Sequence, residues 1–217
     1  MKVMNQTSNV KVFEDNKKVS LLSTRGLTTI SLLSAISVVL MLFDIPLWFA
    51  PSFYKIDFSE VPVLIGAFAL GPVAGVIIEL IKILLNLLIN GTDTAFVGEF
   101  ANLIVGCSLV VPSAIIYHIK RTKKSAILGM VIGTLTFTLA GCLLNAYLLL
   151  PTYATLFHMP IEGLVSMGTA VNPNINSLWT FVLLAVVPFN LIKGVSVSII
   201  TAVLYKHVRG IIKGYHS

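Results

Sequence analysis

The sequence predicts an all-α integral membrane protein, a six transmembrane helix bundle with both termini cytoplasmic. Three observations predict this fold class. The 217 residues are 56% hydrophobic and only 11% charged, whereas a soluble domain carries about 25% charged residues. Six apolar segments can be separated along the chain, and a membrane-spanning helix needs about 20 apolar residues. Twelve of the fifteen basic residues fall in three segments that six crossings place on one side.

The six apolar segments lie between two polar tails. Residues 1–24 are polar and basic and are predicted to form a cytoplasmic tail, followed by one membrane domain over 25–208. No small-residue cleavage site closes the first apolar segment, so we interpret it as a retained span rather than a signal peptide. A second cytoplasmic tail is expected at 209–217. The spans are predicted at about 26–43, 60–70, 73–90, 97–119, 125–150 and 178–206.

Lysine and arginine predict the orientation, because loops rich in these residues stay in the cytoplasm. Lys55 is the only basic residue in a loop on the opposite side, and Lys82 and Lys193 lie within spans. The chain is therefore expected in the cell membrane as a multi-pass protein. Because topology explains the net charge of +6, no nucleic-acid partner is expected. The clustered basic residues are Lys2, Lys11, Lys17, Lys18, Arg25, Lys120, Arg121, Lys123, Lys124, Lys206, Arg209 and Lys213.

Asn190 and Lys193 are the most unusual polar residues of the last span. Their i, i+3 spacing places both on one face of a helix. A lysine can extend its ammonium to the membrane surface, but Lys193 precedes Lys206 by thirteen residues, about 20 Å along a helix. Ionisable groups so deep in a membrane usually face the protein interior or water. The pair therefore predicts a polar site within the bundle.

Two further pairs have the same i, i+3 spacing. Glu79 and Lys82 in the third span have opposite charges, which favours an internal ion pair. Glu99 and Asn102 in the fourth span have two open interpretations, lining of a pocket and structural hydrogen bonding. Asn145 lies near the outer end of the fifth span. The predicted topology places polar residues of three spans at outer and middle membrane levels, as in a pocket open to the outside.

Other segments leave alternatives open or exclude chemistry. Trp48, Phe49, Phe53 and Tyr54 precede the second span, where aromatic residues either anchor the chain at the membrane interface or cover a flat ligand. The segment 151–176, rich in Pro, Asn and Gly, is expected as a loop. The sequence contains no phosphate-binding loop, no zinc-protease motif and no hydrolase nucleophile motif. The histidines have no metal-ligand spacing. An enzyme is not predicted.

Four segments carry a family resemblance. They are FYKIDFSEVPVLIGAFALGPVAGVIIELIKILLNLL at 53–88, TAFVGEFANLIVG at 94–106, LLNAYLLLP at 143–151 and PFNLIKG at 188–194. Together they resemble the substrate-binding S components of energy-coupling factor (ECF) vitamin transporters, and among these the riboflavin-specific type. The resemblance extends over nearly the whole predicted membrane domain.

The resemblance implies a bundle that binds riboflavin from outside, as a transported ligand and not as a cofactor. In this family an asparagine of the fifth span and an N-x-x-K motif of the sixth hold the isoalloxazine ring. The matching positions here are Asn145, Asn190 and Lys193. The family's first loop forms part of a lid over the ligand, which makes Tyr54 and Asp57 candidate ligand-binding residues beside Glu99 and Asn102.

The resemblance also implies that the chain lies in the lipid bilayer and has protein partners both there and in the cytoplasm. These are an ECF transmembrane coupling subunit and two cytoplasmic ATPases. In the family, small residues in an A-x-x-x-A pattern on the first span pack against the coupling subunit. The nearest match is Ser31 and Ala35, and Val39 departs from the pattern at the third position. Small residues four positions apart permit close helix approach in membranes.

These observations lead to one function hypothesis and two rivals. The chain is expected to capture riboflavin for ATP-driven uptake, with flavin mononucleotide as an open second ligand. The first rival is a self-sufficient secondary transporter in which Glu79 or Glu99 carries a proton, although no inverted repeats are visible. The second rival is a membrane enzyme, and the catalytic motifs that would support it are absent from the sequence.

Overall fold

The computed structural model describes residues 21–51, 54–92, 94–156 and 158–213, with side chains described up to 205. Phe53 and most of the predicted N-terminal tail lie outside these residues. The described residues form helices and one short antiparallel ladder, joined by turns and irregular segments; in the ladder β1 (Ile45–Pro46) pairs with β2 (Lys55–Ile56). The all-α membrane class predicted from the sequence is confirmed.

The helix bounds follow the apolar segments of the sequence closely. The second and third helices, α2 (Glu60–Leu70) and α3 (Pro72–Asn90), begin and end within one residue of the predicted spans. The other elements are α1 (Thr24–Leu42), α4 (Val97–Lys120), α5 (Lys123–Leu144), η1 (Asn145–Leu149), α6 (Leu150–Leu156), α7 (Ile161–Thr169), α8 (Leu178–Phe181), η2 (Val182–Val186) and α9 (Val187–Lys213), where η marks a π-helical turn.

Only five of the six predicted spans are long enough to cross a membrane by themselves. Within the described residues these are 24–42, 72–90, 97–120, 123–156 and 178–205. The helix α2 has 11 residues, a length of about 16 Å, whereas the hydrocarbon core is about 30 Å thick. The structure thus has five long apolar helical segments and one short helix at the position of the short second segment predicted from the sequence.

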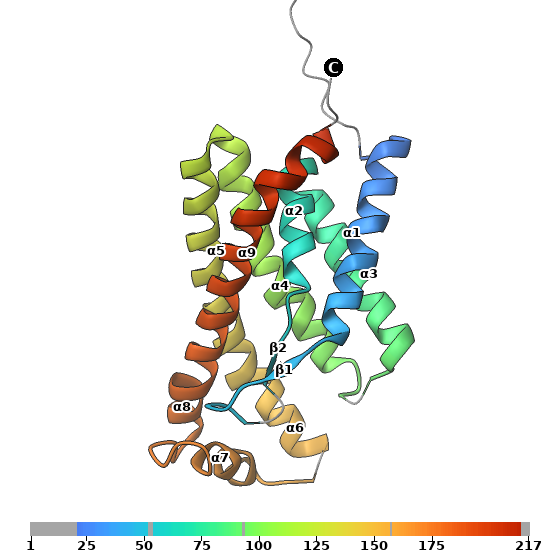
Figure 1. Ribbon diagram of the computed structural model, residues 1–217. Helices are drawn as coiled ribbons and strands as arrows, with labels where there is room; N and C mark the ends of the chain where they lie inside the picture. The colour runs from blue at the N-terminus through green and yellow to red at the C-terminus, as the bar shows by residue number, and fades with distance from the viewer. Residues whose placement is uncertain (1–20, 52–53, 93, 157, 214–217) are drawn as a thin grey trace, which may run out of the picture.

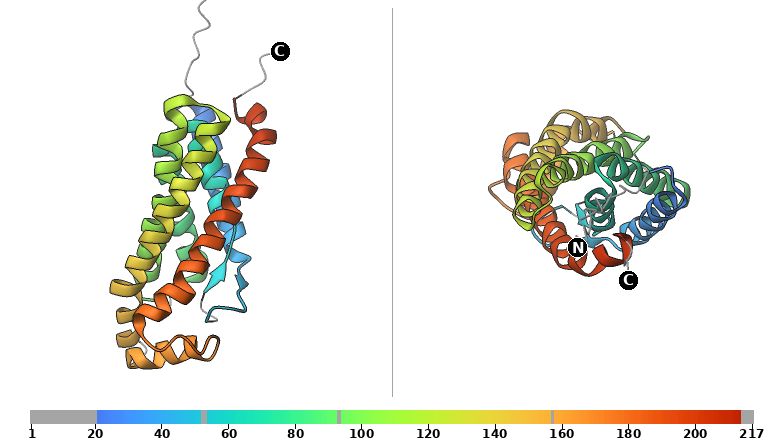
Figure 2. Two further views of the ribbon diagram at one scale, coloured as in Figure 1. Left: turned by 90° about the vertical axis from the view of Figure 1, so that its left-hand side faces the viewer. Right: turned by 90° about the horizontal axis from the view of Figure 1, so that it is seen from above.

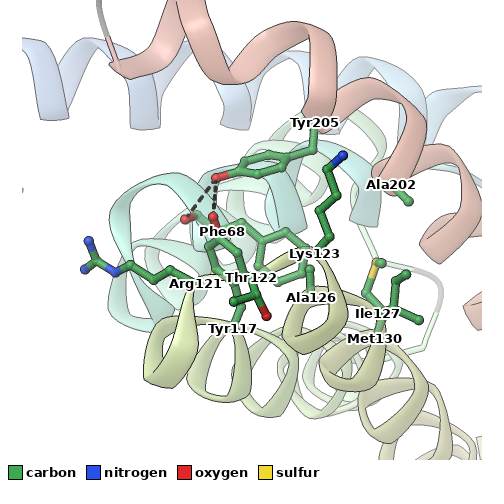
Figure 3. Close-up of a pocket in the computed structure, with 10 residues that line it drawn as sticks. All are labelled: Phe68, Tyr117, Arg121, Thr122, Lys123, Ala126, Ile127, Met130, Ala202 and Tyr205. Atoms are coloured by element: carbon green, nitrogen blue, oxygen red, sulfur yellow. Dashed lines mark hydrogen bonds between the residues drawn. The ribbon is translucent and has the colours of Figure 1, made fainter.

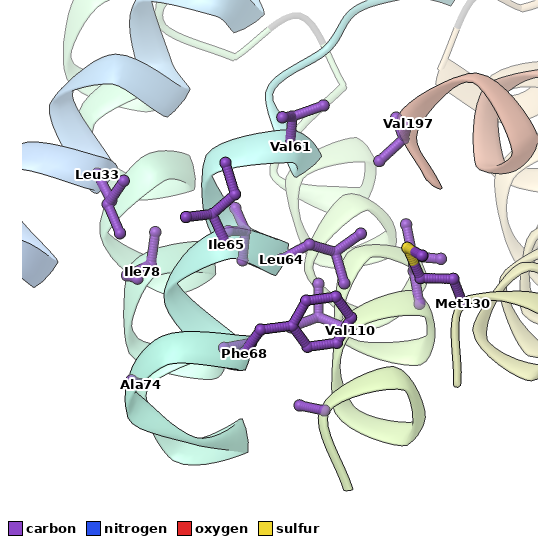
Figure 4. Close-up of a cluster of buried hydrophobic side chains, with 14 of the residues drawn as sticks. Leu33, Val61, Leu64, Ile65, Phe68, Ala74, Ile78, Val110, Met130 and Val197 are labelled. Carbon is purple, nitrogen blue, oxygen red and sulfur yellow. The ribbon is translucent and has the colours of Figure 1, made fainter. Parts of the chain in front are cut away.

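The short helix α2 occupies the centre of the bundle (Figure 2). Every residue from Glu60 to Phe68 is buried, and Leu64 and Phe68 contact apolar side chains from neighbouring helices in the cluster drawn in Figure 4. A helix that is apolar on all sides belongs in a core rather than at a surface. The five long segments therefore surround α2 and separate it from lipid.

Glycine permits the tight connection between α2 and α3. Gly71 ends α2 with φ of 115°, a conformation that residues with a Cβ rarely adopt. One turn later, a Cβ at Gly75 would lie 2.7 Å from the Cβ of Ala67. The absence of a side chain lets the two helices approach closely, which is how helices associate in membranes where lipid is as apolar as leucine.

The three predicted basic segments share one end of the bundle. The beginning of α1, the α4–α5 connection and the end of α9 lie together in Figure 1, while the β1–β2 hairpin, α6 and α7 lie at the opposite end. Arg25 is in the first turn of α1, and Lys120 and Lys123 flank the α4–α5 turn. The three basic segments thus lie at one end of the bundle, as expected from the distribution of lysine and arginine along the sequence.

The predicted loop 151–176 is largely helical, which corrects the sequence-based expectation. It contains α7 and most of α6, and it packs at the end away from the basic segments. Leu164 and Val165 of α7 join an apolar cluster with Tyr54, Ile175 and Phe181. Tertiary packing of apolar residues thus stabilises short helices in a segment whose Pro, Asn and Gly content suggested irregular structure.

Candidate functional site

A cavity of about 260 Å³ lies inside the bundle on the side of the β1–β2 hairpin. It is slightly smaller than typical small-molecule pockets, which begin at roughly 300 Å³. Its walls come from the segment before α2, the first half of α4, the end of α5 with η1, and the beginning of α9. The lining side chains include Tyr54, Lys55, Asp57, Asn102, Phe137, Asn145, Tyr153, Phe189, Asn190 and Lys193.

Lys193 reaches the cavity as half of a buried ion pair. Its Nζ lies 2.8 Å from Oδ2 of Asp57, and both residues are 8% exposed. The other oxygen of Asp57 accepts hydrogen bonds from the backbone N–H of Ser59 at 2.9 Å and from the Ser59 hydroxyl. A carboxylate with an ammonium and two hydrogen-bond donors around it is stabilised in its charged form. Asp57 is therefore a carboxylate that fixes the ammonium in place.

Asn190 lies one turn from Lys193 and keeps hydrogen-bonding capacity for a ligand. Its Nδ2 donates to the backbone oxygen of Val186 at 2.8 Å, and its carbonyl oxygen has no donor among the described residues. A Cβ at Gly141 would lie 2.7–2.9 Å from the Asn190 amide group. The glycine therefore makes room for this amide between α5 and α9.

Asn145 connects the bundle to the segment before α2. Its Oδ1 accepts a 2.5 Å hydrogen bond from the Tyr54 hydroxyl, and its Nδ2 donates to the backbone oxygen of Gly141 at 2.8 Å. The Tyr54 ring lies 5.0 Å from the Phe189 ring and 6.1 Å from the Phe181 ring. Burial raises the pKa of Tyr54, so the hydroxyl remains a donor at neutral pH. Polar groups and flat aromatic walls thus meet at this point.

Two π-helical turns shape the backbone beside the cavity. Each ends two residues before a proline, η1 before Pro151 and η2 before Pro188. Proline has no N–H, and its ring clashes with the carbonyl four residues earlier. A wider turn relieves this clash, and π-helical turns are frequent at functional sites. Asn145 begins η1, and η2 contains the carbonyl that accepts from Asn190.

The structure brings most, but not all, of the candidate residues to the cavity. Six of the seven line it: Tyr54, Asp57, Asn102, Asn145, Asn190 and Lys193. Glu99 is not among the lining residues, and its Oε2 accepts a hydrogen bond from the Thr94 hydroxyl at 3.1 Å at the beginning of α4. Asn102 has no side-chain hydrogen bond to the described residues and is available to a ligand.

Sequence reasoning missed most of the aromatic walls of the cavity. Phe137 and Phe189 line it from α5 and α9, and Tyr153 from α6. Lys55, which the sequence offered only as a possible phosphate contact and as a marker of topology, also lines it and pairs with Asp44 at 2.8 Å. Aromatic residues are common in apolar spans, so only the proximity of Phe189 to Asn190 in the sequence could have indicated a role.

A second ionic cluster lies deeper and does not line the cavity. Nζ of Lys82 lies 2.8 Å from Glu60 and 2.7 Å from Glu79, and all three side chains are at most 1% exposed. The predicted Glu79–Lys82 ion pair is thus confirmed, with Glu60 of α2 as an additional member. Gly106 of α4 leaves room for the cluster, since a Cβ there would lie 2.7 Å from Cδ of Glu79. These contacts bind α2 to α3.

Known proteins resemble this chain over most of its length. Residues 25–205 match the family model for the substrate-specific component of ECF transporters. The riboflavin transporter RibU of Staphylococcus aureus (strain TCH60) is 36% identical over 197 residues, which cover 91% of this chain and 97% of that protein. The riboflavin transporter FmnP of Bacillus subtilis (strain 168) is 31% identical over 185 residues, 85% of this chain and 92% of that protein.

The fold has also been seen in a solved structure. A chain described under "Structure and mechanism of the S component of a bacterial ECF transporter" superposes with a TM-score of 0.67 at 37% identity. The similarity covers 87% of this chain and 97% of that chain. The family match, the relatives and the fold agree with the internal polar cavity. The chain therefore belongs to the substrate-specific components of ECF transporters.

Proposed function

We propose that this membrane protein captures riboflavin from outside the cell and delivers it to an ECF coupling module. As a substrate-specific component it is a subunit of a transporter and not an enzyme. One observation carries the choice of ligand. Asn145, Asn190 and Lys193, from η1 and α9, line a single cavity together with aromatic rings. The relatives named as riboflavin transporters support the same ligand.

The donors and acceptors of this cavity suit the edge of an isoalloxazine ring. That edge carries carbonyl oxygens and ring nitrogens in one plane. An amide both donates and accepts hydrogen bonds, whereas an ammonium only donates. Asn190 and Lys193 lie one turn apart and can bind neighbouring atoms of the edge. Phe137 and Phe189 supply apolar surface for the faces of the ring.

Ligand entry requires the contacts of Tyr54 to change. The Tyr54 hydroxyl donates a hydrogen bond to Oδ1 of Asn145, an atom that a ligand could otherwise contact. The cavity volume of about 260 Å³ also leaves little space for the ribityl chain. We infer that the segment carrying Tyr54 moves on binding and then covers the ligand. The ribityl hydroxyls would point toward Asn102 and the hairpin end of the bundle.

A fluorescence titration of the purified chain tests this proposal. Riboflavin fluorescence should be quenched at a one-to-one ratio, because aromatic side chains enclose the ring. Thiamine, a vitamin without a flavin ring, should not compete. Flavin mononucleotide should compete, because its phosphate can reach Lys55 at the rim, and Lys55→Ala should weaken that competition alone. A chain that leaves riboflavin fluorescence unchanged would exclude the flavin site.

The partners are proposed from family membership and the outer surface of α1. Ser31 and Ala35 are exposed on this helix, so small residues face outward where a transmembrane coupling subunit could approach closely. Two cytoplasmic ATPases would then drive release. We also propose six membrane crossings, in which α2 and the extended residues before it form the shortest, and cytoplasmic termini at the basic end.

A further inference from the structure

A second cavity lies at the basic end of the bundle and shares no lining residue with the candidate riboflavin site. Its volume is about 300 Å³. Its walls come from the end of α2, the α4–α5 turn, the first turns of α5 and the last turns of α9 (Figure 3). Nothing in the proposed riboflavin chemistry uses this cavity.

The base of this cavity is aromatic. The ring of Phe68 lies 4.9 Å from that of Tyr117 and 5.7 Å from that of Tyr205. The two tyrosine hydroxyls are 3.1 Å apart, and that of Tyr205 donates to the backbone oxygen of Phe68 at 3.4 Å. These polar atoms therefore have partners within the protein, and the rings offer apolar surface to an occupant.

The side of the cavity between α5 and α9 consists of aliphatic residues. Met130 is buried, Ala202 is exposed, and Ile127 is 57% exposed. The two helices diverge toward this end in Figure 2. Their outer faces are apolar as well, with Leu128 54% exposed on α5. In a membrane protein such surface faces lipid, so the cavity lies beside the hydrocarbon of the bilayer.

The rim of the cavity is cationic. Arg121 and Lys123 line it and are exposed, and neither forms an ion pair with a carboxylate among the described residues. Lys120 and Lys124 add positive charge beside them. Aliphatic and aromatic walls below an unpaired cationic rim are complementary to a molecule with a hydrocarbon tail and an anionic head.

We propose that this cavity binds one anionic phospholipid of the adjacent leaflet. An acyl chain lies between α5 and α9 against the aromatic base, the phosphate contacts Lys123, and Arg121 adds positive charge at the rim. Basic pockets between transmembrane helices on the cytoplasmic side are suited to anionic headgroups. The apolar lining favours a lipid over free phosphate, which would occupy only the rim. The position of the cavity beside the hydrocarbon of the bilayer favours a lipid over a soluble partner.

Native mass spectrometry of the full chain in detergent tests the charge at the rim. Dioleoylphosphatidylglycerol should bind as a single retained adduct, more tightly than dioleoylphosphatidylcholine. Lys123→Ala should weaken phosphatidylglycerol binding about fivefold, because it removes a cationic side chain that lines the cavity. Lys124→Ala is the matched control, because it removes the same charge next to the cavity without lining it, and it should have little effect.

A second pair of variants tests the apolar interior. Ala202→Phe fills the space between α5 and α9 and should abolish the retained adduct, whereas Ile199→Phe, on the exposed face of α9 outside the cavity, should leave it unchanged. Unaltered riboflavin binding by both variants shows that they fold. Equal binding of the two lipids, equal effects of Lys123→Ala and Lys124→Ala, or displacement of the lipid by inorganic phosphate would overturn the proposal. If the thiol of an Ala202→Cys variant is protected from modification only by a coupling module, the occupant is a protein partner and the lipid proposal is overturned.

Discussion

At the scale of single residues, the Asn190–Lys193 pair has the sharpest consequence for binding. Asn190→Ala or Lys193→Met should each weaken riboflavin binding roughly 5- to 150-fold, because an unmade buried hydrogen bond costs about 1–3 kcal/mol. Lys193→Arg should not restore binding, since a planar guanidinium cannot replace a compact ammonium. Fluorescence titration measures these losses.

The control for this pair is Ser196→Ala, which changes a polar residue of α9 that does not line the cavity. The double variant of Asn190 and Lys193 should lose less than the sum of the single losses, because the two residues bind one edge of the ligand. Normal binding by folded Asn190→Ala and Lys193→Met variants would show that both residues are structural.

Asp57 should act through Lys193 rather than through the ligand. Asp57→Asn leaves a buried ammonium without its counterion, and Lys193→Met leaves a buried carboxylate. Each should destabilise the protein by about 3–5 kcal/mol. The double variant removes both charges and should unfold closer to the temperature of the parent, as measured by thermal unfolding in detergent. Additive losses in the double variant would contradict this interpretation.

The deeper cluster should respond unequally to removal of its members. Lys82→Met leaves two buried carboxylates without a cation and should lower stability by about 3–5 kcal/mol or prevent folding. Glu79→Gln leaves the Glu60–Lys82 pair intact and should cost much less. Thermal unfolding and the yield of folded protein measure both effects. A Lys82→Met protein as stable as Glu79→Gln would show that charge balance in this cluster is unimportant.

The sequence could indicate local pairs of residues but not distant ones. Spacing alone placed Asn190 beside Lys193 and Glu79 beside Lys82, because a helix brings positions i and i+3 together. The partner of Lys193 is Asp57, 136 residues away, and no local rule connects them. The ligand-binding roles of all these residues are still predictions, and the position of Glu99 outside the cavity was not foreseeable from its spacing.

At the scale of elements, we expect the π-helical turn η2 to be required for riboflavin binding. This turn depends on Pro188, which does not itself line the cavity. Pro188→Ala restores an N–H and permits ordinary α-helical bonding, which would rotate the residues before it relative to Asn190. Riboflavin affinity should fall several-fold while stability rises or stays constant. Pro112→Ala in α4 is the control, because that proline lies inside an α-helix without a π-helical turn.

Substitutions on the outer face of α1 should affect coupling to the transport module and leave riboflavin binding unaffected. Ala35→Trp places a bulky side chain where close helix approach is proposed, so it should reduce uptake in the presence of a coupling module and leave riboflavin binding unchanged. Leu135→Trp is the control on the exposed face of α5. Equal uptake by the two variants would place the coupling surface elsewhere.

Helix bounds were predictable where the apolar pattern is continuous, as in α3 and α4. The short helices α6 and α7 were not, because their stability comes from contacts with residues such as Ile175 and Phe181 rather than from local sequence. The central position of α2 was also not predicted. A segment of 11 apolar residues is compatible with a buried helix or a short span, and only the surrounding helices decide.

At the scale of the whole molecule, the basic end should face the cytoplasm. A cysteine introduced near Lys123 should be protected from a membrane-impermeant thiol reagent in intact cells, and one near Asn172 should react. The reason is the retention of basic loops inside the cell. The reverse labelling pattern would make the candidate site open inward and contradict capture from outside.

Energy coupling can be tested separately from binding. The chain alone should bind riboflavin but should not accumulate it, because its sequence has no phosphate-binding loop. Concentrative uptake should require a coupling module and ATP. Accumulation by the chain alone in cells without such modules, driven by a proton gradient, would favour a secondary transporter.

The enclosure of the charged groups has a consequence for movement of the subunit within the bilayer. Among the described residues, the buried acidic and basic side chains are Asp57, Glu60, Glu79, Lys82 and Lys193, and all of them belong to the two ionic clusters. A tilt of the entire bundle would carry these charges along without exposing them to hydrocarbon, where a bare charge is expensive. The lipid would meet a largely apolar surface of the bundle at every angle. Resistance to tilting would then arise mainly at the two ends, from the Asp44–Lys55 pair and from the arginine and lysines of the α4–α5 turn.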